Sequence, residues 1–316
     1  MATEPFVTAL SPSPAQGSYA TRVAVLRDYW ALTKPEVNFL ILITTFAGFY
    51  RGCASAGRPF SFAALFNTLL GTLLVASGTG TLNQYLERHF DAQMRRTARR
   101  PAAAGRIGSS AVLAFGIALS AVGTVYLAST VNSTASLLAL FTLLSYLFLY
   151  TPLKRKTSLC VLIGAFPGAM PPLIGWAAAV GRLNIDGLNI GRLDMEPWML
   201  YAILFLWQFP HFMAIAWMYR EDYDRAGYLV LPKGRERLPF VIVQTILPQF
   251  ALIALSIASL QAHHTDILLW WGALLGIGFL YFGLQFAVQR SRGSARQLLK
   301  ASIIYLPLLC AFTLAI

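Results

Sequence analysis

The chain has 316 residues, of which 57% are hydrophobic and only 12% are charged, with a mean hydropathy of +0.59. Soluble domains carry about a quarter charged residues, so this composition excludes a water-soluble globular protein. The net charge of +12 is explained by basic loops at one membrane face and calls for no nucleic-acid partner.

Residues 1–30 precede the first long apolar run. They contain Ser, Pro, Gly and Ala but no long apolar core followed by a cleavage site, so they are neither a secretory signal nor a membrane span. We expect a disordered cytoplasmic tail over 1–30 and a single polytopic membrane domain over 31–316.

Nine apolar runs follow, each close to the ~20 residues that a helix needs to cross a bilayer. They cover 35–52, 62–83, 111–130, 134–152, 158–180, 198–219, 239–260, 266–288 and 298–316. The sequence therefore predicts an all-α integral membrane protein with about nine transmembrane helices.

The loops between these runs carry an uneven share of the basic residues. If the N-terminus is cytoplasmic, 21 of the 25 Lys and Arg residues fall on the cytoplasmic side. The opposite side keeps only Arg51, Arg58, Arg182 and Arg192. Because cytoplasmic loops are enriched in Lys and Arg, we expect the N-terminus inside and the C-terminus outside.

Three carbonyl-bearing side chains, Asn83, Glu87 and Asp91, end the second run at a spacing of four residues. This spacing puts them in a slanted stripe on one helix face. Two stacked carboxylates repel each other unless a cation lies between them, and such oxygen ligands suit Mg²⁺ completed by substrate phosphates. The stripe predicts a metal site at the cytoplasmic end of the second span.

A basic segment comes directly after this stripe. Its members are Arg88, Arg95, Arg96, Arg99 and Arg100, and guanidinium groups bind phosphate oxygens in bidentate fashion. Acids that hold a metal beside bases that hold phosphate describe a diphosphate site. The alternative is an ordinary interfacial helix end, in which the acids simply pair with these arginines.

A second group of acids lies where the sixth span leaves the membrane on the same side. It begins at Arg220 and contains Glu221, Asp222 and Asp224. Two matched clusters on the second and sixth helices would let two half-sites face each other across a shared cavity. We take Asp222 as the metal ligand and keep Glu221 and Asp224 as alternatives.

His211 lies inside the sixth span, eleven residues before Asp222. On a regular helix that spacing puts it on nearly the same face and ~16 Å deeper. An ionisable side chain at this depth usually faces a cavity, which favours substrate contact or proton transfer. The alternative is a neutral histidine that forms a hydrogen bond within the bundle.

Three further cationic residues fall at the same face. Lys34 precedes the first span, while Lys154 and Arg155 follow the fourth. Each could reach a diphosphate, although loop lysines also occur as plain topology signals.

Several strings in this chain resemble the UbiA superfamily of intramembrane prenyltransferases, and within it the branch that farnesylates haem. The likeness runs in order over about 30–316. The strings are Leu32-Thr33-Lys34-Pro35, the Asn83…Glu87…Asp91 motif with the arginines up to Pro101, Tyr150-Thr151-Pro152-Leu153-Lys154-Arg155, the segment 168–176 (Gly-Ala-Met-Pro-Pro-Leu-Ile-Gly-Trp), Pro210-His211-Phe212, and Asp222-Tyr223 with Arg225-Ala226-Gly227.

The resemblance implies a UbiA-type helical bundle in a bacterial inner membrane with its active site at the cytoplasmic face. Farnesyl diphosphate and haem B would be the substrates and Mg²⁺ the cofactor, giving haem O and diphosphate; haem A synthase or a terminal oxidase assembly would be possible partners. The metal would be held by Asn83, Glu87, Asp91 and Asp222, and His211 would hold the haem or organise a water. The substrate-binding residues would be Lys34, Arg95, Arg100, Lys154, Arg155, Arg220 and Tyr223.

Two departures from the family pattern bear on these assignments. Glu87 stands where many members have Asp, and the second motif lacks the evenly spaced Asp pair of the wider superfamily. Two other functions stay open: a prenyltransferase for an aromatic ring, as in quinone synthesis, and a transporter whose intramembrane polar residues line a path.

Overall fold

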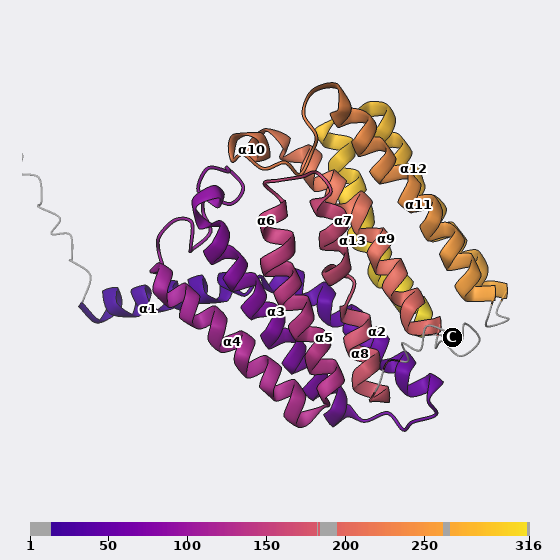
Figure 1. The fold of residues 1–316 in the computed structure, drawn as a ribbon, viewed down its shortest axis with the longest axis horizontal. Coiled ribbons are helices and arrows are strands. Elements are labelled where there is room, and N and C mark those ends of the chain that lie inside the picture. Colours follow the sequence, from indigo (N-terminus) through magenta and orange to yellow (C-terminus); the bar gives the residue numbers. More distant parts are fainter. Residues whose placement is uncertain (1–13, 182, 184–194, 262–265, 315–316) are drawn as a thin grey trace, which may run out of the picture.

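The structure is a computed structural model that describes residues 14–181, 183, 195–261 and 266–314, and it is helical throughout the elements it describes. Figure 1 shows the long helices side by side in one bundle, with the short α10 across one end. The elements are α1 (Pro14–Leu32), α2 (Pro35–Ser55), α3 (Phe62–Asp91), α4 (Ser109–Thr130), α5 (Ser133–Leu144), η1 (Ser145–Tyr150), α6 (Thr151–Leu153), α7 (Cys160–Gly168), α8 (Pro171–Val180), α9 (Met195–Met218), α10 (Arg220–Arg225), η3 (Gly234–Glu236), α11 (Arg237–Gln261), α12 (Asp266–Gln289) and α13 (Arg292–Leu314).

Within the described part of the chain, eight spans are long and apolar enough to cross a membrane. They match the first eight predicted runs, so the prediction of an all-α membrane protein is confirmed. The ninth run lies in α13, which begins at Arg292 rather than at 298 and carries three basic residues in its first half. Helix α13 is not among the eight spans found in the described residues, and the orientation of the bundle stays a prediction.

The N-terminal segment differs from the expected disordered tail. Helix α1 occupies residues 14–32, and Arg106 donates two hydrogen bonds to the Asp28 carboxylate, at 2.8 and 2.9 Å. This ion pair ties α1 to the loop before α4, an interaction between distant segments that composition alone does not reveal. Residues 1–13, and the predicted far-side Arg182 and Arg192, lie outside the described residues.

The two largest of four buried clusters of apolar side chains form most of the core of the described residues. The larger gathers residues of α7, α9, α11, α12 and α13, and the second gathers residues of α3, α4, α5 and α8. Because lipid is as apolar as leucine, close van der Waals packing and hydrogen bonds stabilise such a bundle more than burial of apolar surface does.

A direct backbone approach joins α2 to α8. A Cβ atom added at Gly48 would meet the Pro172 carbonyl, and one added at Gly175 would meet the Thr45 carbonyl and the Phe49 amide. Glycine is required at both positions because the two helix backbones touch directly. This contact sets the place of α2, whose N-terminal end carries Lys34.

The fourth span ends in an irregular turn. Pro152 has no N–H and cannot continue the α-helical ladder, and the preceding residues form the π-helical segment η1. The Thr151 amide and hydroxyl both donate to the Tyr146 carbonyl, five residues back. The turn brings Thr151 and Lys154 toward α3, and π-helical turns are frequent at functional sites.

Helix α9 stops at Met218, where we expected the sixth span to continue regularly. Tyr219 has φ −113° and ψ 21°, and α10 starts in a new direction after it (Figure 1). The predicted alignment of His211 with Asp222 assumed an unbroken helix, so that geometric argument does not hold.

The α2–α8 contact predicts a difference between two kinds of glycine. Gly175→Ala or Gly48→Ala should destabilise the protein by about 2 kcal/mol or more, because the methyl group meets backbone that cannot move aside. Gly278→Ala in α12, where no atom lies within 4 Å of the added Cβ, should leave stability unchanged or raise it by about 0.5 kcal/mol. Thermal unfolding in detergent measures both, and equal midpoints for all three variants would contradict the close contact.

Candidate functional site

The predicted stripe lies at the C-terminal end of α3 and is buried. Asn83, Glu87 and Asp91 are 2%, 5% and 3% exposed. The Asn83 side-chain amide donates to the Glu87 Oε2 at 2.9 Å, so the two lie on one helix face as their spacing predicts. With 30 residues α3 is ~45 Å long, longer than the ~30 Å hydrocarbon core, which lets its last turns carry polar groups at the membrane surface.

Two lysines from other elements converge on this stripe. Lys154 donates to both Glu87 oxygens, at 2.9 and 3.2 Å, and Lys34 donates to the Asn83 Oδ1 at 2.8 Å. The Asn83 amide also donates to the Thr151 hydroxyl at 3.3 Å. The first span, the end of the fourth span and the second span are thereby joined through one set of polar contacts.

Lys34 reaches this position through an unusual backbone conformation. Its φ of 54° and ψ of 59° lie in the left-handed region, directly before Pro35 at the start of α2. A residue other than glycine in this region costs on the order of 1–3 kcal/mol, and such conformations cluster at functional sites. The conformation is balanced here by the contact with Asn83.

Positive charge exceeds negative charge at this site, as the pKa of Lys34 indicates. Burial first, and then the Arg100 guanidinium, lower the pKa of Lys34 to about 7, with Lys154 adding to the effect and Glu87 and Asp91 opposing it. Burial would also lower the pKa of Lys154, but the adjacent Glu87 carboxylate, together with Tyr150 and Tyr146, outweighs it and raises that pKa well above its usual value. Three cations face two carboxylates, so an added anion would stabilise the charged form of Lys34.

The third member of the stripe is paired with the basic segment that follows it. Arg100 donates to the Asp91 Oδ2 at 2.7 Å, and the Thr97 hydroxyl donates to the Asp91 backbone carbonyl at 2.9 Å. Both contacts fold the segment after α3 back over the end of its own helix. Arg100 is therefore placed beside the stripe, as a phosphate ligand would need to be.

The second acidic cluster meets the first through this same segment. The backbone N–H of Arg96 donates to the Asp222 Oδ2 at 3.2 Å, and Arg225 bonds both to the Asp222 Oδ1 and, at 3.5 Å, to the Gln93 carbonyl. Asp222 is 6% exposed. Helix α10 is thus held against the segment after α3, with the Asp222 carboxylate between them.

Glu221 and Asp224, the alternatives to Asp222, turn away from this contact. Glu221 pairs with Arg292 at 3.0 Å and Asp224 with Arg237 at 2.9 Å, and both acids are largely exposed. Of the three acids, only Asp222 is buried against the first cluster.

The remaining predicted substrate-binding residues contact groups other than the carboxylates of the stripe. Arg155 stacks on the Phe90 ring at 4.3 Å, and Arg220 folds onto Trp217 and donates to its carbonyl. Tyr223 packs edge-on against Tyr228 at 5.9 Å. Arg95 is exposed on the segment after α3.

His211 is placed away from the acidic stripe, against α13. Its Nδ1 lies 2.8 Å from the Ser302 hydroxyl, and its ring stacks on Trp207 at 4.6 Å. Among the described residues, the hydrogen bond and ring contacts of His211 do not reach the stripe on α3. The structure therefore separates a polar cluster at the membrane surface from a histidine deeper in the bundle.

The sequence patterns did not single out two residues of the site, Thr151 and Tyr228. Thr151 contacts Asn83, and Tyr228 packs on Phe90 and Tyr223. Burial and then the nearby Glu87 carboxylate raise the pKa of the Tyr228 hydroxyl, which places this side chain beside the stripe. The Leu229 amide donates to the Lys154 carbonyl at 2.7 Å, which holds this loop over the site. No signal in the sequence marks Tyr228, because its place depends on how the loop after α10 folds back.

The donor chemistry at the stripe fits a magnesium ion. Asn83, Glu87 and Asp91 offer amide and carboxylate oxygens, the ligands that Mg²⁺ prefers. Across the described residues, however, no three His, Cys, Asp or Glu side chains lie close enough together to hold one ion. Asp91, next to Glu87 on α3, contacts the basic segment at Arg100, and Asp222 contacts it at the Arg96 amide, so the acids form two separate half-sites.

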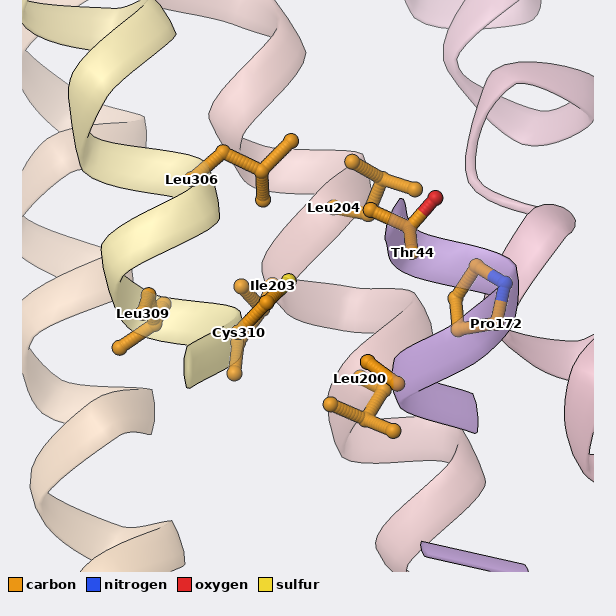
Figure 2. Close-up of a pocket in the computed structure, with 9 residues that line it drawn as sticks. Thr44, Pro172, Leu200, Ile203, Leu204, Leu306, Leu309 and Cys310 are labelled. Carbon is orange, nitrogen blue, oxygen red and sulfur yellow. The ribbon is translucent and has the colours of Figure 1, made fainter. Parts of the chain in front are cut away.

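A pocket lined mainly by hydrocarbon groups lies within the bundle, between α2, α9 and α13. Figure 2 shows Leu200, Ile203 and Leu204 on one side and Leu306 with Leu309 on the other. Thr44, Ala47, Pro172 and Cys310 complete its lining. The bundle thus combines a charged cluster at one end with apolar space between its helices.

Comparisons with known proteins agree with this arrangement. A model of the UbiA prenyltransferase family matches residues 41–306. A protein of Solibacter usitatus named protoheme IX farnesyltransferase is 45% identical over 291 residues, covering 90% of this chain and 96% of that protein. Among solved structures, a UbiA homologue from Aeropyrum pernix K1 superposes with a TM-score of 0.66 at 19% identity, covering 88% of this chain and 98% of that chain. A UbiA homologue from Archaeoglobus fulgidus bound to DMAPP and Mg²⁺ gives 0.62 at 17% identity, covering 91% and 98%.

The helical bundle and the buried charge cluster at its end define a membrane-embedded prenyltransferase. The chain belongs to the UbiA prenyltransferase family. Prenyl transfer is accordingly its activity, while the acceptor, the metal and the roles of single residues are proposals.

The buried Glu87–Lys154 pair predicts that removing one partner lowers stability more than removing both. Lys154→Met should lower the free energy of unfolding by about 3 kcal/mol or more, since it leaves the Glu87 charge buried without its main partner. The double variant Glu87→Gln/Lys154→Met should recover most of that stability. Unfolding in detergent is the measurement.

The exposed pair of Arg292 with Glu221 provides the control, because each side chain is 58% exposed. Arg292→Met should change stability by no more than about 0.5 kcal/mol. A Lys154→Met variant as stable as this control would show that the buried pair is not needed.

Proposed function

We propose that the chain transfers the farnesyl group of farnesyl diphosphate to a vinyl group of haem B, with addition of water, giving haem O and diphosphate. The use of a prenyl diphosphate as donor is supported by the cluster of Lys34, Arg100 and Lys154 around two buried carboxylates. The haem half is supported by the name of the Solibacter relative at 45% identity and by the segment 168–176 with the Pro210-His211-Phe212 string.

We propose Mg²⁺ as the cofactor, which would be held at two half-sites, one of Asn83, Glu87 and Asp91 and the other of Asp222. The oxygen donors of these residues suit it, and the Archaeoglobus homologue is described as bound to Mg²⁺. When bound, the ion would neutralise negative charge on the diphosphate.

Three cationic side chains would bind the diphosphate and stabilise its charge. Lys34, Arg100 and Lys154 hold the diphosphate and stabilise the charge that develops on it as the bond between farnesyl C1 and oxygen breaks. The diphosphate leaves with the electron pair, and the allylic cation stays among apolar helices that exclude water.

The acceptor step depends on position rather than on a strong base. The vinyl group is a weak carbon nucleophile, so it must lie directly beside farnesyl C1. The new carbon–carbon bond leaves a cation next to the porphyrin, and water adds there with loss of a proton.

We place the protein in the bacterial inner membrane with the charge cluster on the cytoplasmic side. The support is the positive charge of the loops at that end, where 21 of the 25 basic residues fall, together with the bacterial relatives. A complex with haem A synthase or a terminal oxidase assembly stays a prediction.

Turnover of the purified full-length chain tests the acceptor. With farnesyl diphosphate, Mg²⁺ and haem B it should form haem O and release one diphosphate per haem, and chelation of Mg²⁺ should stop both. Prenylation of 4-hydroxybenzoate in place of haem would refute the haem assignment in favour of an aromatic acceptor. No diphosphate release with either acceptor would favour a transporter.

The two half-sites predict which acids matter. Glu87→Gln, Asp91→Asn and Asp222→Asn should each lower kcat/KM by at least about 100-fold, since each removes charge beside the leaving group. The exposed neighbours give matched controls: Glu221→Gln and Asp224→Asn should stay within a few-fold of the unmutated chain. Steady-state haem O formation measures this, and full activity of Asp222→Asn would remove it from the ligand set.

A further inference from the structure

Helix α1 leaves the bundle at the level where α3 reaches the membrane surface. The Leu32 carbonyl, at the end of α1, accepts hydrogen bonds from the Thr81 hydroxyl at 3.3 Å and from the Gln84 side-chain amide at 3.0 Å. These two residues lie about 20 positions beyond Phe62, where α3 begins, a rise of ~30 Å that equals the thickness of the hydrocarbon core. From this level α1 runs outward from the side of the bundle rather than along it (Figure 1).

One face of α1 is occupied by the rest of the protein. Leu32 is fully buried, the Tyr29 ring packs edge-on against Phe115 at 4.9 Å, and Asp28 pairs with Arg106 at 2.8 Å. These contacts fix how the helix is rotated about its axis. The side chains on the opposite face therefore point away from the rest of the chain.

That opposite face carries an apolar stripe made of Val23, Leu26 and Trp30. The three side chains are 46%, 69% and 64% exposed. At about 100° per residue, their spacing of three and then four positions puts them within about 60° of one another around the helix. Aliphatic side chains and a tryptophan at this level are typical of a helix that lies in the surface of a membrane.

Two arginines border the apolar stripe, one on each side. Around the same helix Arg22 falls about 40° to one side of Leu26, and Arg27 falls about 40° beyond Val23. Both arginines are exposed, and among the described residues no hydrogen bond or salt bridge engages either of them. Arginines in such positions keep their stems on hydrocarbon while their guanidinium groups bind headgroup phosphates.

We propose that α1 is an interfacial helix that docks on anionic lipid of the bilayer around the bundle, with the apolar stripe at the hydrocarbon boundary and the two flanking arginines on headgroup phosphates. Anionic lipid is favoured over neutral lipid because Asp28, the acid next to these arginines, is already paired with Arg106. The inference goes beyond the proposed function and does not depend on it, since it requires only that the bundle spans a bilayer.

Electron paramagnetic resonance of the full-length chain in phosphatidylglycerol nanodiscs tests the docking. A nitroxide is attached to a cysteine introduced at one stripe position at a time, and Ala24→Cys and Ala31→Cys, on the other exposed side of α1, serve as matched controls. Cys53, Cys160 and Cys310 are buried and do not compete for the label. Collisions with oxygen, which concentrates in lipid, are compared with collisions with a nickel chelate, which stays in water.

We expect the labels on the apolar stripe to be accessible to oxygen and protected from nickel. Their ratio of oxygen to nickel collisions should exceed that of the labels at Ala24 and Ala31 by at least about tenfold, because the stripe lies in the acyl boundary while the alanines face water. All the labelled positions are exposed, so the substitutions leave the packed contacts of α1 intact.

The preference for anionic lipid is measured separately, in phosphatidylcholine nanodiscs that contain a trace of nitroxide-labelled lipid. A fluorophore on Leu26→Cys should be quenched at least about fivefold more by labelled phosphatidylglycerol than by labelled phosphatidylcholine, since each basic residue near a membrane surface contributes about this factor. Adding Arg22→Gln/Arg27→Gln should abolish the difference. Arg292→Gln/Arg296→Gln, which removes two exposed arginines from α13 instead, should preserve it.

Three results would overturn the inference, and each points to a different surrounding. Stripe labels that are as accessible to nickel as those at Ala24 and Ala31 would place this face in water. Protection from both oxygen and nickel would place it against protein, and spin–spin broadening between the labels would then identify a second copy of the chain. Equal quenching by the two labelled lipids in the chain with both arginines would remove anionic lipid as the partner.

Discussion

Burial of opposite charges at the end of an apolar helical bundle is the constraint on which the rest of the structure depends. The Glu87 and Lys154 side chains are 7% and 12% exposed and meet at 2.9 Å. A charge removed from water must find partners nearby, so Glu87 requires Lys154 and the Asn83 amide. Lys34 in turn requires Asn83, and these contacts join the starts or ends of three spans.

The packing of the apolar helices positions the polar groups at this charged end. Direct backbone contact of α2 with α8 at Gly48 and Gly175 fixes the helix that starts beside Lys34. The π-helical turn before Pro152 brings the fourth span close enough for Lys154 to reach α3. Close packing and backbone irregularity therefore act together, the first holding the helices and the second aiming the polar groups.

Local patterns in the sequence were sufficient for the spans and for the stripe on α3, because hydropathy and a four-residue spacing are properties of single helices. They also selected Asp222 over its neighbours; Asp222 is the buried one of the three acids, and its role as a metal ligand stays a prediction. Local sequence patterns do not predict contacts between segments that are distant along the chain. The break at Tyr219 changed the relation of His211 to the acids, and the place of Tyr228 depends on a folded-back loop.

The central claim is that the cluster of Lys34, Arg100 and Lys154 receives a diphosphate. A structure of the full-length chain with Mg²⁺ and the unreactive farnesyl thiodiphosphate tests it most directly. We predict that the thiodiphosphate lies among these three cations, with the ion between it and the carboxylates of Glu87 and Asp91. Thiodiphosphate bound elsewhere, with the Glu87–Lys154 and Asp91–Arg100 pairs unchanged, would contradict the account.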